Sequence, residues 1–183
     1  QLYCEQAAEK TYIKKDAKYV SVIVMNPSNG EIFAMVNYPE FHLNDPFTLT
    51  EEVNVPAEKK QDLLNQMWRN QCISDTYEPG STFKAMTFAA ALNEGVIDMY
   101  KDTYYDKGYE VVGGATIKSW KKGGHGLQSF IEVLQNSSNP GFVEISRRLG
   151  KDRMYDYVSE FGFGKKTGVD IAGESKGITL IAL

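Results

Sequence analysis

The sequence predicts an α+β fold. Near the N-terminus, two β-branched apolar runs flank an Asn-Gly turn, the strongest short-range signal for a β-hairpin. From residue 56 onward, apolar residues recur mainly at helical spacing, with one minor hairpin among them. Strands and helices therefore do not alternate as in a parallel βαβ fold. A chain of 183 residues with 42% hydrophobic and 24% charged residues is long enough to bury a core.

The first third of the chain predicts the main hairpin with helices on either side. Helix formers that end in two lysines open the chain, a charge arrangement that suits a helix C-terminus. Pro56 suits the first turn of a later helix because its fixed φ is already helical. The predicted elements are a helix at 2–15, strands at 19–25 and 31–38, a loop at 39–55 and a helix at 56–69.

The remainder predicts a mostly helical body. After a Glu-Pro-Gly break, residues 81–93 form an Ala-rich helix that carries almost no charge, so we expect it to run through the core. Glycine pairs divide the segment that follows into short strands. The predicted elements are a small hairpin within 103–118, a turn at 121–126, helices at 127–136, 140–149 and 151–161, and a short strand at 169–171.

Composition excludes several classes of function. The net charge of -4 gives no support for nucleic-acid binding, and no run of 18 apolar residues predicts a membrane span. Cys4 and Cys72 cannot form a disulfide framework or a structural zinc site; they could pair once, but two free or buried thiols are favoured. His42 and His125 are too few and too far apart for a metal site. Gln1 opens neither a Met start nor a signal peptide, so we expect a cut inside a longer protein.

Ser81 and Lys84 are the first candidate catalytic pair. Residues three apart at the start of a helix share one face, with Cβ atoms roughly 5–6 Å apart, and the lysine leans back over the serine. A neutral lysine can activate a serine hydroxyl, and lowering its pKa from about 10.4 to near 7 takes roughly 4–5 kcal/mol. A third polar partner is therefore expected. The plain alternative is an N-cap serine followed by a solvated first-turn lysine.

Ser137 and Asn139 are the second candidates, in a short break between two predicted helices. A hydroxyl can relay a proton and a carboxamide can bind a peptide carbonyl, and two residues apart in a loop they can point the same way. The alternative is a helix break in which these residues serve as an N-cap before Pro140. Asn136 also begins a glycosylation acceptor pattern, which carries little weight here.

The triplet Lys166-Thr167-Gly168 resembles the third motif of the penicillin-recognising serine enzymes. The functional version must lie on a strand that faces the nucleophile. Here the triplet follows directly on the Gly-rich helix stop at 161–164 and comes soon after Asn139. We therefore interpret it as a decoy.

Three stretches together resemble class B penicillin-binding proteins over residues 1–178. The opening hairpin also fits the start of their transpeptidase domain. The matching strings are Arg69-Asn70, Ile73-Ser74-Asp75 and Tyr77-Glu78-Pro79-Gly80-Ser81-Thr82-Phe83-Lys84 for the nucleophile segment; His125-Gly126 and Ser137-Ser138-Asn139-Pro140-Gly141-Phe142 for the second motif; and Phe161-Gly162-Phe163-Gly164, Thr167-Gly168-Val169-Asp170 and Gly173-Glu174 for a non-catalytic stretch after it.

The resemblance implies the penicillin-binding transpeptidase fold, in which helices flank an antiparallel sheet and a helical lobe holds Ser137 and Asn139 against the Ser81 helix. Residues 1–183 would be the N-terminal and central portion of one such domain. In the family, the catalytic Lys-Thr/Ser-Gly strand lies further downstream, so we expect an incomplete domain. Residues 179–183 do not match the family.

The resemblance also implies the chemistry. Ser81 would attack the penultimate D-Ala carbonyl of a peptidoglycan stem peptide and form an acyl-enzyme, and its N–H would supply half of an oxyanion hole. Lys84 would be the base, Ser137 the proton relay, and Asn139 would hold the substrate amide. β-Lactams would acylate the same serine. No metal or organic cofactor is implied, a glycosyltransferase partner is left open, and an N-terminal helix outside this chain would anchor the domain on the outer face of the bacterial membrane.

Within the family, Ile117-Lys118-Ser119-Trp120 and the Asn-Pro-Gly-Phe flank resemble the spore-cortex branch. Members of that branch often carry cysteine at the positions of Ser119 and Ser138, so either this chain lacks that redox pair or the cysteines were changed. Other functions stay open at this point: a D,D-carboxypeptidase or β-lactamase, a β-lactam sensor, or a non-catalytic scaffold that keeps the fold.

Overall fold

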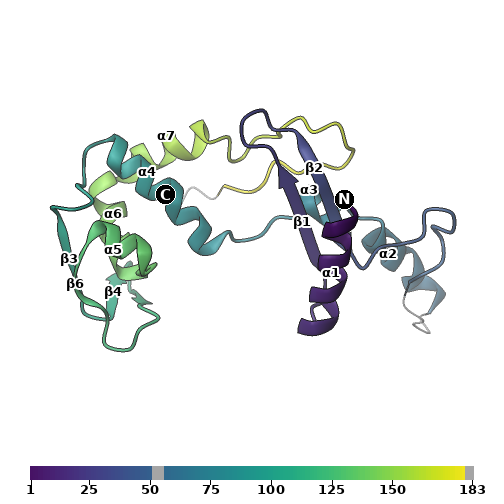
Figure 1. Cartoon of the computed structure of the whole chain (residues 1–183), viewed down its shortest axis with the longest axis horizontal. Helices are drawn as coiled ribbons and strands as arrows, with labels where there is room; N and C mark the ends of the chain where they lie inside the picture. Colours follow the sequence, from purple (N-terminus) through teal and green to yellow (C-terminus); the bar gives the residue numbers. More distant parts are fainter. Residues whose placement is uncertain (51–55, 180–183) are drawn as a thin grey trace. The chain divides into compact units, whose positions relative to one another are not determined.

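A computed structural model describes residues 1–50 and 56–179 (Figure 1). The chain divides into two compact units. The first consists of Gln1–Thr76 and Lys166–Ile178, and the second of residues 77–165 with Thr179. The last five residues of the predicted loop at 39–55, and the C-terminal residues 180–183, lie outside the described part of the chain.

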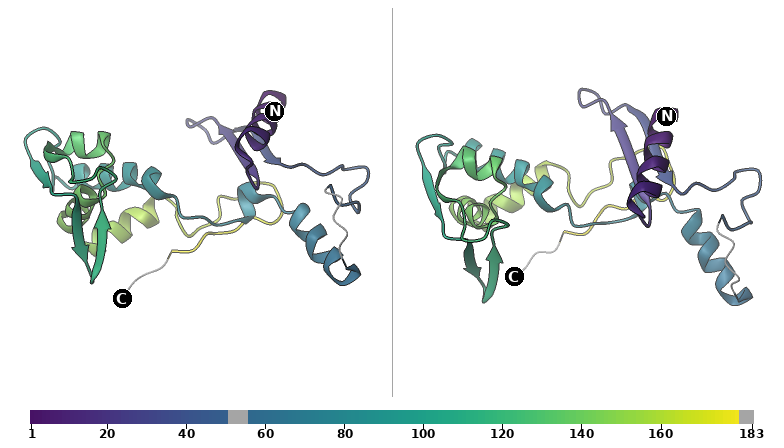
Figure 2. Two further views of the ribbon diagram at one scale, coloured as in Figure 1. Left: turned by 90° about the horizontal axis from the view of Figure 1, so that it is seen from below. Right: turned by 60° about the horizontal axis from the view of Figure 1, so that its bottom comes forward.

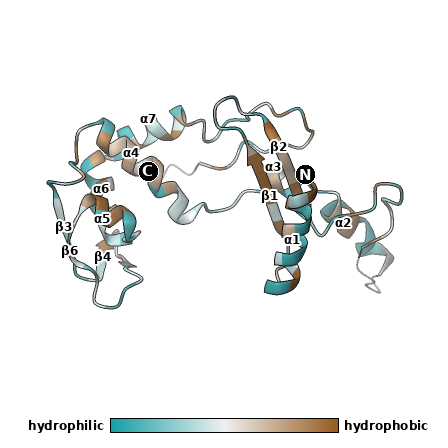
Figure 3. Ribbon diagram, in the orientation of Figure 1, coloured by the Kyte–Doolittle hydropathy of each residue, from teal (hydrophilic) through white to brown (hydrophobic). Residues whose placement is uncertain are grey.

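The first unit is built on the predicted hairpin. β1 (Val20–Met25) pairs antiparallel with β2 (Ile32–Tyr38), with Val22 opposite Val36 and a bulge at Met25. The helix α1 (Leu2–Lys15) lies along the hairpin and buries Ala8, Ala34 and Val36 (Figures 1 and 2). The hairpin and this helix confirm the prediction, because both depend on local signals. Several large apolar side chains of the two strands remain exposed. Figure 3 shows both strands largely in brown, the colour of hydrophobic residues.

Two further helices complete this unit. α2 (Ala57–Met67) confirms the helix predicted after Pro56. α3 (Gln71–Ser74) is a single turn that the sequence analysis missed; the Asn70 side chain begins it by accepting the Cys72 N–H. The half-buried Cys72 thiol bonds to strand carbonyls, and burial raises its pKa. Cys4 and Cys72 are both free thiols.

Residues 166–178 pack on α3. The Ser74 hydroxyl donates to the Gly173 carbonyl at 2.8 Å, and the Ser175 N–H donates to the Ile73 carbonyl at 2.8 Å. The strand predicted at 169–171 is wrong, because this segment is irregular. The N–H groups of Thr167 and Gly168, directly before this segment, donate to the Glu174 carboxylate rather than to a neighbouring strand.

The second unit has a helical core. α4 (Lys84–Asn93), α5 (Phe130–Gln135) and α6 (Asn139–Leu149) pack together, and α7 (Lys151–Glu160) contacts α4 and α6. α4, in which Lys84 is the one charged residue, buries five of its ten residues, in line with its apolar composition. The buried core side chains are Phe88, Ala91, Ile97, Phe130, Val133, Phe142 and Ile145.

Two short antiparallel pairs flank this core. β4 (Tyr109–Val112) and β5 (Ala115–Lys118) form the predicted small hairpin across Gly113-Gly114. β3 (Thr103–Asp106) pairs instead with β6 (Gly126–Ser129). The helix predicted at 127–136 is therefore wrong in its first residues: a capping box between Ser129 and Glu132 begins α5 only at Phe130.

The helix predicted at 81–93 is divided in two. A 3₁₀ turn, η1 (Gly80–Phe83), contains Ser81, and α4 begins at Lys84. The Thr82 hydroxyl donates to the Pro79 carbonyl at 2.6 Å, and this hydrogen bond stabilises the start of the 3₁₀ turn. The fold class is α+β, as predicted. Over residues 1–50 and 56–179, no helix has the length and apolar character needed to cross a membrane.

Candidate active site

The four predicted site residues come together within the second unit. The Ser137 hydroxyl donates to Ser81 Oγ at 3.0 Å. The Lys84 ammonium donates to Ser137 Oγ at 3.0 Å, to the Ser137 carbonyl at 2.8 Å and to Asn139 Oδ1 at 2.5 Å. Lys84 is thereby linked to Ser81 through the hydroxyl of Ser137, which is the third polar partner that the sequence analysis expected.

Local backbone geometry places Ser81 and Lys84 on the same side. Gly80 adopts a left-handed φ of 59°, which lets the chain turn sharply into η1. In a 3₁₀ turn, side chains at i and i+3 eclipse each other. The N-cap alternative for Ser81 is wrong, because Pro79 and Phe83 occupy the cap positions of η1 and α4. The solvated-lysine alternative is wrong as well, because Lys84 is half-buried and hydrogen-bonded.

The junction between α5 and α6 places Ser137 and Asn139 toward Lys84. Ser137 has a left-handed φ of 51°, and its carbonyl and hydroxyl oxygens both meet Lys84. Asn139 also donates through Nδ2 to the Lys118 carbonyl at 3.3 Å. Ser138, between them, is fully buried and caps α6 by accepting the Gly141 N–H. The N-cap interpretation is therefore correct for Ser138, while its two neighbours face the lysine.

The surroundings of Lys84 favour its neutral form more than water does. Burial lowers its pKa below the ordinary lysine value. Within the described part of the chain, its partners are three neutral oxygens and the Phe142 ring, whose centroid lies 5.3 Å from Nζ. A carboxylate partner would have opposed the loss of the proton far more strongly. The cluster can therefore pass a proton from a hydroxyl to an amine.

The triplet at 166–168 belongs to the first unit and does not lie on a strand, as expected. Both the hydroxyl and the N–H of Thr167 donate to Glu174 Oε1 at 2.6 Å. The Gly168 N–H donates to the other oxygen of the same carboxylate at 3.2 Å. These bonds lower the pKa of Glu174 and occupy the donors of Thr167 and Gly168.

Two features beside the site were missed by sequence reasoning. The carboxylate of Asp106 is completely buried and accepts a hydrogen bond from Ser138. The exposed indole of Trp120 donates to the Asn136 carbonyl at 2.7 Å and packs edge-on against His125. Neither residue belongs to a recognisable catalytic pattern, so no local signal could have identified them.

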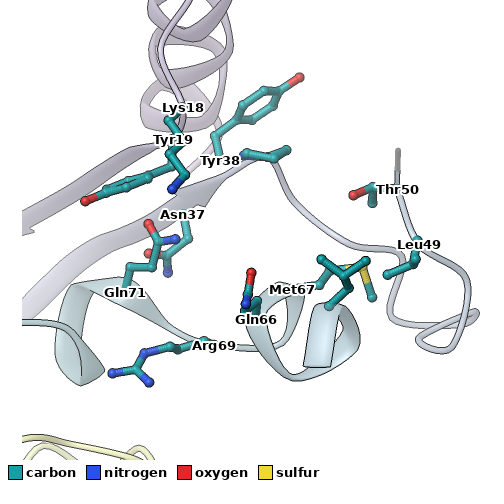
Figure 4. A pocket seen from close by; sticks show the side chains of 12 residues that line it. Lys18, Tyr19, Asn37, Tyr38, Leu49, Thr50, Gln66, Met67, Arg69 and Gln71 are labelled. Atoms are coloured by element: carbon teal, nitrogen blue, oxygen red, sulfur yellow. The ribbon is translucent and has the colours of Figure 1, made fainter. Parts of the chain in front are cut away.

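The first unit contains a separate pocket of about 230 Å³ between its hairpin and α2 (Figure 4). Polar side chains such as Asn37, Gln66 and Gln71 line it, together with Leu49 and Met67. None of the four predicted site residues lines this pocket. Among the residues that the structure describes, no three His, Cys, Asp or Glu side chains gather as a metal site would require.

Comparison with known proteins agrees with the resemblance. The family described as penicillin binding protein transpeptidase domain matches residues 20–181, so the expectation that the family resemblance stops before residue 179 is wrong for 179–181. Stage V sporulation protein D of Bacillus subtilis is 44% identical over 93% of the chain and 25% of its own length, which confirms the resemblance to the sporulation branch. The peptidoglycan D,D-transpeptidase MrdA of Acinetobacter baumannii is 32% identical over 86% of the chain and 23% of its own length. The chain thus spans about a quarter of the length of these relatives.

Solved structures agree with the fold. The crystal structure of penicillin binding protein 3 from Mycobacterium tuberculosis, complexed with aztreonam, is 28% identical with a TM-score of 0.77 and covers 99% of this chain and 37% of its own. Pseudomonas aeruginosa PBP2, in complex with WCK 5153, is 26% identical with a TM-score of 0.75 and covers 96% and 39%. On the family match, the relatives and the fold, the chain belongs to the penicillin-binding protein transpeptidase domain family.

Proposed function

We propose that this chain carries the acylation machinery of a peptidoglycan D,D-transpeptidase, with Ser81 as the nucleophile. The observation that supports this most directly is the hydrogen-bonded series from Lys84 through Ser137 to Ser81. A serine hydroxyl is a weak nucleophile and needs a neighbouring base. The neutral form of a half-buried Lys84 supplies that base, and Ser137 connects the two groups.

In acylation, Ser81 Oγ bonds to the carbonyl carbon of the penultimate D-Ala. With Lys84 neutral, the hydroxyls of Ser81 and Ser137 donate toward Lys84, the reverse of their direction around the ammonium. The Ser81 proton then passes to Ser137 Oγ while the Ser137 proton passes to Lys84 Nζ, and the negative charge develops on the carbonyl oxygen. The tetrahedral intermediate then collapses, the carbon–nitrogen bond breaks, and the proton held by Lys84 returns to the departing amine of the terminal D-Ala. An ester on Ser81 and free D-Ala are the products.

In the second step, the amine of a neighbouring stem peptide attacks the ester carbonyl. Its proton passes through Lys84 and Ser137 to Ser81 Oγ as the Ser81–acyl bond breaks, which restores the serine hydroxyl, and a new amide cross-links the two stems. Asn139 contacts Lys84 through Oδ1, and we assign its carboxamide to holding the substrate amide. A β-lactam follows the first step only, since its leaving nitrogen stays attached to the acyl group.

The relatives support a proposal for substrate and location. Because one relative is named a peptidoglycan D,D-transpeptidase and another a stage V sporulation protein, we assign stem peptides ending in D-Ala-D-Ala as substrates and a role in sporulation. We also assign the domain to the outer face of the membrane, where peptidoglycan is cross-linked. β-Lactams are the corresponding inhibitors.

The test is intact mass spectrometry after incubation with a penicillin. It is run on this chain and on the chain extended through the downstream Lys-Thr/Ser-Gly strand of the family. We expect one penicillin adduct per chain, mapped to Ser81 and lost in Ser81→Ala. Ser159→Ala is the matched control, since it makes the same chemical change at an exposed position of α7 and should keep the adduct. No adduct in either chain, with both shown to be folded, would overturn the proposal.

A second assay identifies the acyl acceptor. The extended chain is given a D-Ala-D-Ala stem peptide together with an acceptor amine, and the products are separated by mass. We expect the cross-linked peptide to form. Release of D-Ala with hydrolysed peptide alone would instead make the protein a carboxypeptidase.

A further inference from the structure

Asp106 is a buried carboxylate that the mechanism above does not use. It lies at the end of β3 and has no exposed surface. Its Oδ1 accepts the Gly108 N–H at 2.7 Å, and its Oδ2 accepts the Ser138 hydroxyl at 3.0 Å. Among the described residues, its hydrogen-bond partners are these two neutral donors, and no Lys or Arg forms an ion pair with it.

Burial of the Asp106 carboxylate with only neutral hydrogen-bond donors is unfavourable for the folding stability of the protein. Transfer of a carboxylate from water into the protein interior carries a large desolvation penalty, which neutral donors offset only in part. A well-packed apolar residue at the same position would generally stabilise the fold more. The chain also packs tightly here: a Cβ on Gly124 would collide with the Asp106 carbonyl oxygen, so the neighbouring turn closes directly over this strand end. Folding stability therefore does not explain why a carboxylate occupies this buried position.

The partner of Asp106 is the middle residue of the Ser137-Ser138-Asn139 segment. The Ser138 hydroxyl donates to Asp106 and accepts the Gly141 N–H at 3.2 Å, so both its proton and a lone pair are committed. Its side chain points into the core, while those of Ser137 and Asn139 bond to Lys84. Because these two hydrogen bonds hold Ser138 in one position, they also restrain the backbone of its neighbours Ser137 and Asn139.

Ser137 has a backbone conformation that depends on the position of Ser138. Its left-handed φ of 51° costs a residue with a side chain such as serine roughly 1–2 kcal/mol. That conformation directs both its carbonyl and its hydroxyl oxygen to Lys84, and the hydroxyl to Ser81. Such a conformation persists only when the surroundings over-determine it.

We propose that Asp106 is a positioning residue for acylation, acting through Ser138. Its carboxylate orients the Ser138 hydroxyl, which holds the strained turn in which Ser137 relays the proton and Asn139 faces Lys84. Asp106 itself touches neither substrate nor the reacting atoms. The inference rests on the proposed function, because it assigns Asp106 a role in the chemistry of Ser81.

The test compares Asp106→Asn, Ser138→Ala and the double variant in the extended chain. Stopped-flow kinetics with a chromogenic β-lactam separates the acylation rate constant from the dissociation constant of the non-covalent complex. We expect the rate constant to fall about 10- to 100-fold in each single variant, as for a catalytic group displaced by about 1 Å, with little change in the dissociation constant. Because both residues act through one hydrogen bond, the double variant should be no slower than the slower single variant.

Asp102→Asn is the matched control. Asp102 flanks the other end of β3, and its carboxylate also accepts a backbone N–H, that of Asp98, together with Arg148. This variant makes the same chemical change and should acylate at the parental rate. A loss of rate that follows only the melting temperature across all variants would mean that Asp106 is structural, and would overturn the inference.

A crystal structure of the Asp106→Asn variant gives a readout that does not need acylation. We expect Ser137 to leave the left-handed region and its Oγ to move out of hydrogen-bond range of Lys84. An unchanged Ser137 overturns the positioning role even if acylation slows. If the parent is never acylated, the proposed function fails, and a displaced Ser137 would leave Asp106 as an anchor of this turn without the catalytic role.

Discussion

The Ser137 hydroxyl donates a 3.0 Å hydrogen bond to Ser81 Oγ, although 56 residues separate the two serines in the sequence. One lies in the 3₁₀ turn before α4 and the other in the junction before α6, and these two helices pack against each other. The packing of one pair of helices therefore determines whether a nucleophile and its relay meet.

Replacing Lys84 by alanine should slow acylation by a penicillin about 10²- to 10⁴-fold, the usual contribution of general acid–base catalysis. The reason is that Ser137 would then have no base to receive its proton. The rate of adduct formation is followed by mass spectrometry, with circular dichroism to verify folding. Acylation at the parental rate in a folded Lys84→Ala protein would show that another group is the base.

The acylation rate of the parent should rise with pH. Only neutral Lys84 can accept a proton, and burial lowers its pKa, so its neutral form appears at a lower pH than for an ordinary lysine of about 10.4. The midpoint of the rate profile should therefore lie below that value. Lys84→Arg keeps a permanent charge and should show neither the rise nor rapid acylation. A flat profile in the parent would argue against a titrating base.

Replacing Lys166 by alanine should leave acylation unchanged. The triplet to which it belongs lies off any strand, and the donors of Thr167 and Gly168 are bound to Glu174. The penicillin adduct is quantified for Lys166→Ala and the parent side by side. Loss of the adduct without unfolding would show that this triplet, and not a downstream strand, is the third catalytic motif.

Gly141→Ala should destabilise the second unit by about 1–3 kcal/mol. A Cβ at this position would lie within overlap distance of the Val133 side chain, because α5 and α6 approach closely there. The free energy of unfolding is measured by urea titration. Val133→Ala in the same chain should recover part of the loss by removing the clashing methyl groups. If the double variant is as unstable as the sum of the two single changes, the close approach is not the cause.

Ile145→Ala should cost about 2–5 kcal/mol of unfolding free energy. Ile145 is completely buried in the core of the second unit, so the truncation leaves a cavity among well-packed neighbours. Leu127→Ala is the control, because Leu127 is 69% exposed and should change stability little. Equal effects of the two substitutions in a urea titration would contradict the assigned core.

The elements predicted correctly are those whose signals are local. The Asn-Gly turn sets the β1–β2 hairpin, Pro56 precedes α2, and the apolar, nearly charge-free run of α4 predicts a buried helix. β6 had no such signal. Its four residues, Gly126–Ser129, become a strand because they pair with Thr103–Asp106, and tertiary pairing overrides the weak propensity of a short segment.

For the candidate site, too, the sequence predicts the chemical groups, whereas the contacts between them depend on packing. Residue chemistry and spacing make Ser81 and Lys84 a candidate nucleophile–base pair and place a hydroxyl and a carboxamide in one short break between helices. The resemblance to class B penicillin-binding proteins is what selects these residues over the N-cap alternative. The sequence could not predict that Ser137 stands between the lysine and the nucleophile, or that Ser138 turns inward to Asp106. Those contacts join residues 32 to 56 positions apart, and they exist only because α4, α6 and β3 pack around one core. Local sequence determined which groups are present, and packing decided which of them touch, because hydrogen bonds act over about 3 Å.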